Sequence, residues 1–167
     1  MVFQLCGFIP VEMVNNGSGT PNEYERSCFK SLLKQVKQAL ADGFDILMFP
    51  EGQLNPTPEN GLLPVFTGVQ SLSKSSRRPI AFVALHGCHS FWRANDESLM
   101  AGMHVTDRAI HVHSYTGDRM MQSDEEFIQT FDAIVGCFGA TGKDAVNLQA
   151  WLDGSAYKNA TLAKTTM

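Results

Sequence analysis

Hydrophobic and polar residues along the chain follow two different periods, and these predict an alternation of strands and helices. Four segments are rich in apolar, β-favouring residues and are predicted strands: residues 5–13, 44–49, 77–87 and 109–115. The segments between and after them repeat their apolar residues every three or four positions, the period of a helix with one buried face. We therefore expect strands that are joined by helices.

Two of the strand segments differ in how much surface they should bury. Residues 44–49, FDILMF, are almost continuously apolar, which is typical of a strand buried on both faces of a parallel sheet. Residues 109–115, AIHVHSY, alternate strictly and predict a half-exposed edge strand. Its two faces carry Ile110 and Val112 on one side, and His111, His113 and Tyr115 on the other.

The first predicted helix has both a start and a stop signal. Thr20 is a suitable N-cap, Pro21 suits the first helical position, and Glu23 completes a capping box. Gly43 is placed to end the helix. The apolar stripe is formed by Phe29, Leu32, Leu33, Val36 and Leu40, and the polar side carries Lys30, Lys34 and Lys37.

Three further helices are predicted later in the chain. A short one covers residues 62–74, where Pro64 suits a first turn. Residues 123–126 form a second capping box, and a last helix lies near 143–152, before a loose tail from Lys158. The helix after the second capping box has an apolar stripe formed by Phe127, Phe131, Ile134 or Val135, and Phe138.

The order of these elements predicts the fold class. Strand, helix, strand, helix, strand, strand, helix, helix implies one α/β domain, with a mostly parallel β-sheet flanked by helices. Ligands of such sheets bind beyond the carboxyl ends of the strands. Glu51 follows the predicted strand at 44–49, so we expect it at a ligand-binding end of the sheet.

The composition narrows the class of protein. With 44% hydrophobic and 18% charged residues among 167, we expect an ordinary globular domain. A net charge of −4 gives no basic field that would attract nucleic acid. The apolar runs are too short to span a bilayer, and the first residues do not form a signal peptide. The cysteines are widely spaced and are expected to be reduced thiols: Cys6, Cys28, Cys88 and Cys137.

Three segments together resemble the glycerophospholipid acyltransferase family, which acylates glycerol 3-phosphate and lysophosphatidate. ILMFPEGQLNPTPENGLLPVFTGV is similar to the third signature of the family, F-P-E-G-T-R-S followed by a Leu-Pro-Phe-like turn and a Gly-containing helix. RRPIAFVALHG resembles the fourth signature, a buried strand, and GFIPVEM resembles the second, G-x-I-x-V-D-R. The order and spacing match over roughly residues 5–120.

The resemblance implies a fold, an activity and a location. The fold would be glycerolipid acyltransferase-like without its N-terminal part, with a partial domain at 1–157 and a loose C-terminal tail at 158–167. The enzyme would transfer an acyl group from acyl-CoA or acyl carrier protein to a hydroxyl of a lysophospholipid or related molecule. It would act peripherally on the cytosolic face of a membrane such as the endoplasmic reticulum. Its partners would be the acyl donor, the lysophospholipid and the membrane surface, with no nucleic acid, no separate cofactor and no metal.

The resemblance also implies that the catalytic base is missing. In the family the base is the histidine of an H-x-x-x-x-D motif upstream of the second signature, and the aspartate orients it. Nothing upstream of GFIPV carries this motif, so we expect a fragment, a truncated gene product or a degenerate relative. Residues 113–118, HSYTGD, fit the pattern literally but follow the fourth signature, and we do not predict them to be catalytic. Loss of the opening elements would bare apolar sheet surface and lower the solubility.

Two positions that bind the acceptor in the family lack the arginines found there. Met13 and Leu54 occupy the two positions where the family has arginines that hold the acceptor's phosphate, and neither side chain can replace a guanidinium. Either the acceptor lacks a phosphate there, or another cation binds it, or the site is inactive. The substrate-binding residues carried over are Glu51, Gly52, Gln53, Leu54 and Asn55, and a basic cluster follows at Lys74, Arg77 and Arg78.

Several interpretations of these residues stay open. Glu51 either shapes the acceptor site or caps backbone donors in the turn after it. The apolar residues at 62–66 either pack in the core, which we favour, or lie along an acyl chain. The basic cluster either meets the phosphates of CoA or is a solvated loop, which is the simpler interpretation.

Two alternatives concern the function as a whole. The loss of both arginine positions suggests a degenerate domain that binds acyl-CoA or lipid without catalysis. The histidines suggest a metal-dependent hydrolase, from H-x-x-H at 86–89 and from His111 and His113 on one strand face. Zinc needs convergent ligands, and these residues lie on separate predicted elements.

Overall fold

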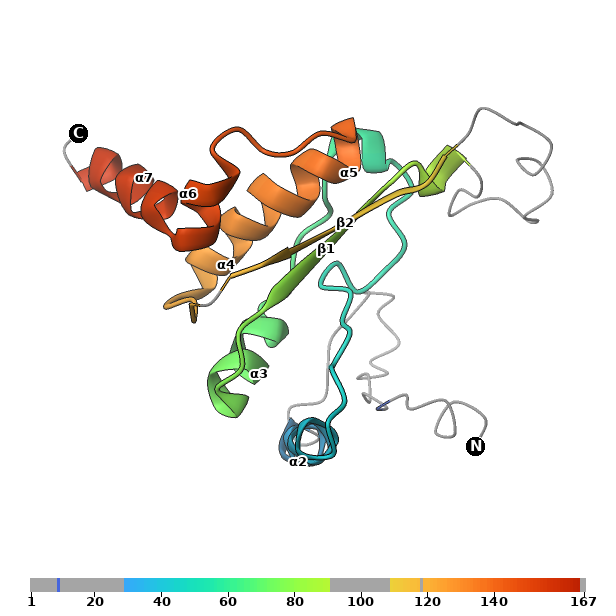
Figure 1. Cartoon of the computed structure of the whole chain (residues 1–167), viewed down its shortest axis with the longest axis vertical. Helices are drawn as coiled ribbons and strands as arrows, with labels where there is room; N and C mark the ends of the chain where they lie inside the picture. Colours follow the sequence, from blue (N-terminus) through green and yellow to red (C-terminus); the bar gives the residue numbers. More distant parts are fainter. Residues whose placement is uncertain (1–8, 10–28, 91–108, 118, 166–167) are drawn as a thin grey trace, which may run out of the picture.

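The computed structural model of the chain describes residues 9, 29–90, 109–117 and 119–165, with side chains described as far as residue 160. A pair of strands crosses this part of the molecule, and the helix formed by residues 124–141 runs alongside them (Figure 1). The predicted strand at 5–13, the first capping box and Asp118 lie outside the described residues.

Two of the predicted strands are confirmed, and they pair with each other. β1 (Ala81–His86) and β2 (His111–Thr116) are antiparallel, in a register that runs from Ala81 opposite Thr116 to His86 opposite His111. Within the described residues the sheet consists of this pair. It is too small to test the predicted, mostly parallel α/β architecture, which stays a prediction.

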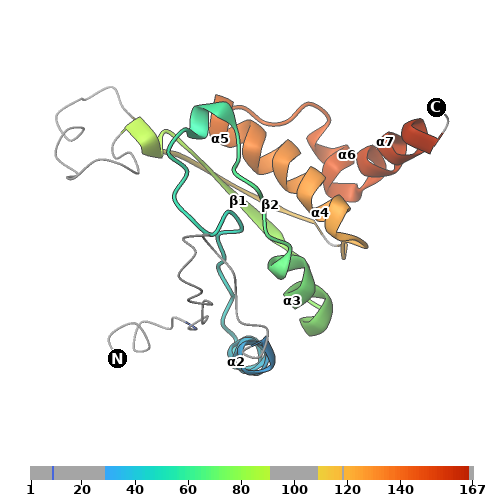
Figure 2. The ribbon, with the colours of Figure 1, turned by 180° about the vertical axis from the view of Figure 1, so that it is seen from behind.

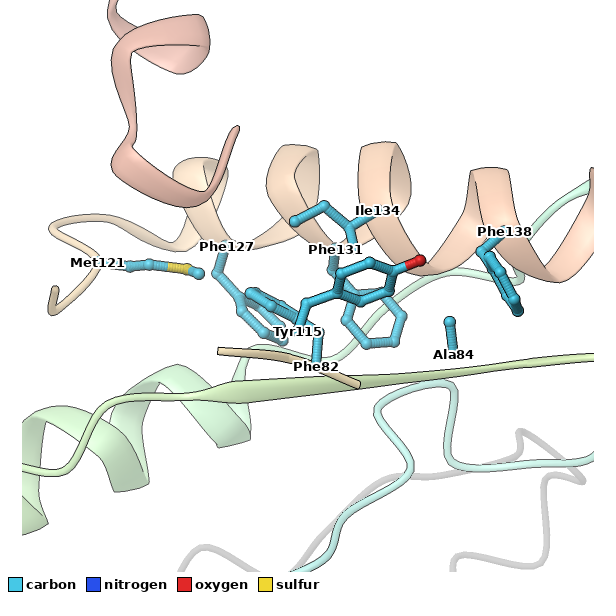
Figure 3. Packing of buried hydrophobic residues seen from close by; sticks show 8 residues of the cluster. All are labelled: Phe82, Ala84, Tyr115, Met121, Phe127, Phe131, Ile134 and Phe138. Atoms are coloured by element: carbon cyan, nitrogen blue, oxygen red, sulfur yellow. The ribbon is translucent and has the colours of Figure 1, made fainter. Parts of the chain in front are cut away.

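The hydrophobic core lies between this sheet and the helix predicted after the second capping box. The helix is formed by α4 (Asp124–Phe131), a π-helical turn η5 (Asp132–Gly136) and α5 (Cys137–Thr141). Burying a large apolar side chain stabilises a fold by about 1.5–3 kcal/mol, so this contact contributes substantially to the stability of the described part of the chain. Figure 3 shows the buried residues: Phe82, Ala84, Tyr115, Met121, Phe127, Phe131, Ile134 and Phe138.

The second capping box is confirmed at the start of α4. The Ser123 hydroxyl accepts a hydrogen bond from the backbone N–H of Glu126 at 3.1 Å. In return, the buried Glu126 carboxylate accepts the backbone N–H of Gln122 at 2.7 Å. The first bond satisfies a donor that an uncapped helix start leaves unpaired. The second goes to the residue before the N-cap and not to Ser123 itself, so the reciprocal bond of the predicted box is displaced by one residue.

Arg119 joins this helix start to the C-terminal helices. Its guanidinium pairs with the Glu126 carboxylate, and its Nε donates to the backbone carbonyl of Leu152 at 2.9 Å. Leu152 lies in α6 (Leu148–Asp153), which Gly154 separates from α7 (Ser155–Thr165). One buried carboxylate and one arginine therefore tie the start of α4 to α6.

The last predicted helix and the tail differ from expectation. The helix begins at Leu148, because Gly142 and Asn147 both have left-handed backbone angles, with φ of 68° and 58°. A continuous helix from 143 cannot contain the second of these angles. Residues 158–165 are helical as part of α7, where we expected a loose tail; the predicted domain bounds stay a prediction.

The helix predicted around the 29–40 stripe is confirmed as α2 (Phe29–Ala41), with Val36 buried. Gly43 ends it as predicted, with a positive φ of 89°, and the N–H of Phe44 donates to the carbonyl of Ala39. Figures 1 and 2 both place α2 at the opposite end of the molecule from helices α4, α6 and α7.

The buried strand predicted at 44–49 is wrong. These residues have no regular secondary structure, and Phe44, Leu47 and Phe49 expose 67%, 72% and 72% of their surface. An apolar run forms a strand only when another strand satisfies its backbone, and no described strand pairs with this segment.

The predicted helix at 62–74 begins later, as α3 (Gly68–Ser76). The backbone N–H groups of Leu63 and Phe66 donate instead to the Glu51 carboxylate and to the carbonyl of Pro50. Both donors have non-helical partners, so residues 61–66 are irregular and not helical. Leu62 and Val65 pack against the core from this segment, as we favoured for this apolar run.

One face of the sheet is packed against helices, and the residues on the other face are exposed. Helices α4 and α5 cover the face that carries Phe82, Ala84 and Tyr115. The other face carries Val83, Leu85 and Val112, which are all exposed. In β2 only Tyr115 is buried, and the other five residues are exposed, so the predicted half-exposed strand is more exposed than expected.

Candidate functional site

The residues that resemble the third signature lie in one loop, whose ends are held together. The loop leaves residue 49 and returns along residues 61–66, and the N–H of Phe66 donates to the Pro50 carbonyl at 2.8 Å. Gly52 has a positive φ of 68°, and its N–H donates to the Phe49 carbonyl at 3.0 Å. This tight turn at Gly52 brings the following residues back toward the Glu51 carboxylate.

The Glu51 carboxylate organises the loop. Its Oε2 accepts the backbone N–H of Leu63 at 2.8 Å and the side-chain amide of Asn55 at 3.0 Å. Hydrogen bonds to a half-buried carboxylate are stronger than those between neutral groups. Glu51 thus caps one backbone donor, but that donor lies across the loop at Leu63 and not in the turn after Glu51, as one interpretation expected. The shaping of an acceptor site stays a prediction.

Asn55 completes the same network. Its amide nitrogen also donates to the Gly61 carbonyl at 2.8 Å, and its Oδ1 accepts the backbone N–H of Thr57 at 3.0 Å. A short 3-10 helix, η2 (Pro58–Asn60), fills the span between these anchors. Glu51 and Asn55 together hold a loop of irregular backbone in one shape.

The other three predicted site residues lie on the outside of this loop. Gly52, Gln53 and Leu54 are exposed, and Leu54 exposes 77% of its surface. The position where the resemblance expects an arginine therefore presents an apolar side chain to solvent. The loop offers a molecule at its surface an amide, a methyl-bearing side chain and the edge of a carboxylate.

The basic cluster is exposed, in line with its simpler interpretation. Lys74 lies in the last turn of α3, and Arg77 and Arg78 follow, with Arg77 in a left-handed conformation. Within the described residues none of the three side chains has an ion-pair partner.

The predicted histidine cluster is only partly assembled. The ring of His86 lies 6.3 Å from that of His89 and 6.2 Å from that of His111, measured between centroids. The Nδ1 of His86 is already bonded to the Gly139 carbonyl at 2.7 Å. In the part of the chain that the structure describes, no three histidine, cysteine or carboxylate residues are placed to hold a metal ion.

His113 has a carboxylate partner that the sequence did not suggest. Its Nδ1 lies 3.3 Å from the Oδ1 of Asp144, and the same oxygen accepts the Tyr115 hydroxyl at 2.5 Å. The imidazole also stacks on the Tyr115 ring, with centroids 4.6 Å apart. No sequence motif links these residues, because Asp144 reaches β2 from the connection between α5 and α6.

The environment of Tyr115 keeps its phenol protonated. Burial, and then the hydrogen bond to Asp144 and the charge of that carboxylate, raise the pKa of Tyr115 well above its ordinary value. The cluster is therefore a neutral phenol and a half-exposed imidazole that share one carboxylate. Chemically it resembles a histidine oriented by an aspartate, although it lies outside the loop of Glu51.

The comparisons with known proteins found no matching protein-family model, no matching curated protein and no matching solved structure. Among the described helices, none has the length and apolar character needed to cross a bilayer.

Proposed function

We propose that this chain is an acyltransferase-like domain of phospholipid or glycerolipid biosynthesis. It binds an acyl thioester of CoA or acyl carrier protein, together with a lysophospholipid or a related hydroxyl compound, at the cytosolic face of a membrane. The observation that carries this proposal is the order of the three segments that resemble family signatures. The third of these segments forms a loop that is held by its glutamate.

The loop residues have separate tasks in this proposal. Glu51 and Asn55 hold the loop in shape, and the exposed Gln53 amide is a neutral hydrogen-bond donor for the acceptor. Leu54 contacts the apolar part of the acceptor rather than its phosphate. The acceptor is then recognised at this loop mainly by neutral contacts, because a leucine cannot bind an anion.

Acyl transfer also needs a base for the acceptor hydroxyl. The hydroxyl oxygen attacks the thioester carbonyl, its proton goes to the base, and the C–S bond breaks to release the thiol. The family's motif base is not found in this sequence, so we expect the chain alone to bind acyl-CoA without measurable turnover.

Two assays on the full chain test the proposal. Calorimetry with a non-hydrolysable acyl-CoA analogue and with lysophosphatidate measures binding, and release of free CoA thiol measures turnover. We expect binding of both ligands, weakened by Glu51→Gln and by Asn55→Ala, and unchanged in Glu59→Gln. Glu59 is the matched control, because it is an exposed glutamate of the same loop that caps nothing. Absence of binding to either ligand would refute the proposal.

A second candidate function is a domain that binds acyl-CoA or lipid but has lost catalysis. The exposed Leu54 at an arginine position favours it. Affinity without turnover, even when an H-x-x-x-x-D segment is added upstream of the chain, would support this candidate. Turnover by the chain as it stands would exclude it, and His113→Ala would then show whether His113 supplies the base.

A further inference from the structure

The strongest unexplained feature is an exposed apolar segment next to a basic helix face. Phe44, Leu47 and Phe49 lie within six residues and each exposes at least 67% of its surface. A soluble surface usually carries such residues singly, and a cluster of them marks an interaction site. The segment follows directly after the C-terminal end of α2, where the Phe44 N–H bonds to the last helical turn.

The helix before this segment carries a stripe of positive charge. Lys30, Lys34 and Lys37 are four and three positions apart, so they share one face of α2. All three are exposed, and none has an ion-pair partner within the described residues. Together with Leu33 and Gln38 they line a hollow of about 420 Å³.

Among the described residues, the acidic groups near this stripe leave it cationic. Asp42 and Asp45 lie in and after the turn that ends α2, and Asp42 accepts a hydrogen bond from Gln38 at 2.9 Å. Neither carboxylate is within ion-pair distance of a lysine of the stripe. The chain as a whole has a charge of −4, so the positive charge is local.

We propose that the lysine face of α2 and the apolar segment 44–49 together dock this protein on an anionic phospholipid surface. Lysines that are not paired attract anionic headgroups over about one Debye length, and exposed aromatic and aliphatic side chains enter the interface. Figure 1 shows α2 at the end of the molecule away from helices α4, α6 and α7, and the apolar segment runs back from α2 toward the sheet.

The proposed function needs a membrane contact, and these residues would form it. The evidence for the contact is the charge and the exposure of these residues, and it does not depend on the proposed function. The lysine face lies on α2, outside the Glu51 loop, whereas the apolar segment ends at Phe49, whose backbone carbonyl accepts the N–H of Gly52 in that loop. Vesicle binding can therefore succeed where acyl-CoA binding fails, and the reverse.

Flotation of the full chain with phospholipid vesicles tests the inference. Wild-type protein is expected to float with vesicles of phosphatidylcholine and phosphatidylserine, and more weakly with phosphatidylcholine alone. Each lysine near an anionic surface strengthens binding about fivefold, so Lys30→Gln, Lys34→Gln and Lys37→Gln together should weaken it about a hundredfold. The combination Phe44→Ser, Leu47→Ser and Phe49→Ser should abolish it.

Matched controls separate these effects from a change in total charge or hydrophobicity. Lys74→Gln, Lys143→Gln and Lys158→Gln remove the same charge from exposed positions elsewhere, and Ile128→Ser with Val146→Ser removes exposed apolar groups. Both controls should bind as the wild type does, and circular dichroism should confirm that every variant is folded.

Three outcomes would overturn the inference. The first is equal flotation of the α2 lysine variant and its lysine control. The second is equal binding of the wild type to neutral and anionic vesicles. The third is a wild-type dimer in solution that the serine variant dissociates, without vesicle binding, which would assign the apolar segment to a contact between two copies of the chain.

Discussion

The shared carboxylate of Asp144 supports a prediction whose size can be worked out from the structure. Tyr115 is buried, and its hydroxyl donates to Asp144, which is itself about half exposed. Replacing Asp144 by alanine leaves a buried hydroxyl unpaired, at a cost of about 1–3 kcal/mol. The lost pair with His113 adds little, because exposed ion pairs contribute about 0–1 kcal/mol. We therefore expect Asp144→Ala to lower the free energy of unfolding by about 2 kcal/mol.

Tyr115→Phe should cost less, because the carboxylate it leaves behind can be hydrated. Tyr115→Phe is expected to lower the free energy of unfolding by about 1 kcal/mol. In the Tyr115→Phe protein, Asp144→Ala should lower the free energy of unfolding by about 1 kcal/mol less than it does in the wild type. Urea denaturation followed by the far-ultraviolet circular dichroism of the helices measures all four members of this cycle. Asp45→Ala is the control, since that aspartate is exposed and should change stability by less than about 0.5 kcal/mol.

The same pair predicts a pH dependence with a definite sign. The pKa of Tyr115 is raised in the folded protein, so the folded chain keeps its proton while the unfolded chain ionises near pH 10. The stability that this residue contributes is fully present below about pH 10 and is lost as the pH rises above it. Tyr115→Phe should show a smaller loss of stability than the wild type between neutral pH and the alkaline range. The pairing of Tyr115 with Asp144 would be refuted by two results together. The first is that the two substitutions lower the free energy of unfolding additively, and the second is that wild type and Tyr115→Phe lose stability equally at alkaline pH.

Three further predictions concern packing and loop order. Phe127→Ala should lower the free energy of unfolding by about 3–5 kcal/mol in urea, because the side chain is fully buried; a cost below about 1 kcal/mol would contradict the core. Arg119→Ala leaves the buried Glu126 carboxylate without its cation and should lower the free energy of unfolding by about 3–5 kcal/mol. Adding Glu126→Gln to this variant removes the unpaired charge and should restore part of the lost thermal midpoint. Asn55→Ala removes the bond to Gly61 and should speed limited proteolysis within residues 52–61 with little change in global stability; equal cleavage rates would show that the loop does not depend on it.

The elements that could be predicted from the sequence are those whose signals are local. The stripe of Phe127, Phe131, Ile134 and Phe138 has the period of one helix face, and the structure buries all four side chains. The capping box at Ser123 and the stop at Gly43 depend on residues a few positions apart. These features need no knowledge of the rest of the fold, because hydrogen bonds within one turn decide them.

In the candidate site, too, only the local features could be predicted from the sequence. The residues at 51–55 could be located from the sequence, since they are contiguous, but the partner of Glu51 could not. Its carboxylate accepts the N–H of Leu63 across the loop, and this contact also delays the start of α3 to Gly68. The pairing of His113 with Asp144 joins a strand to a distant loop and has no motif.

The sequence by itself determined which segments can be helical, where two of the helices begin or end, and that residues 109–115 alternate between two faces. Only the tertiary structure decided that Phe44, Leu47 and Phe49 are exposed and that one face of the sheet carries the exposed residues Val83, Leu85 and Val112. The physical reason is that the sequence of an apolar segment does not by itself decide whether the segment is buried. Whether it becomes a buried strand depends on a neighbouring strand for its backbone and a packed layer for its side chains, and both are supplied by residues far away in the chain.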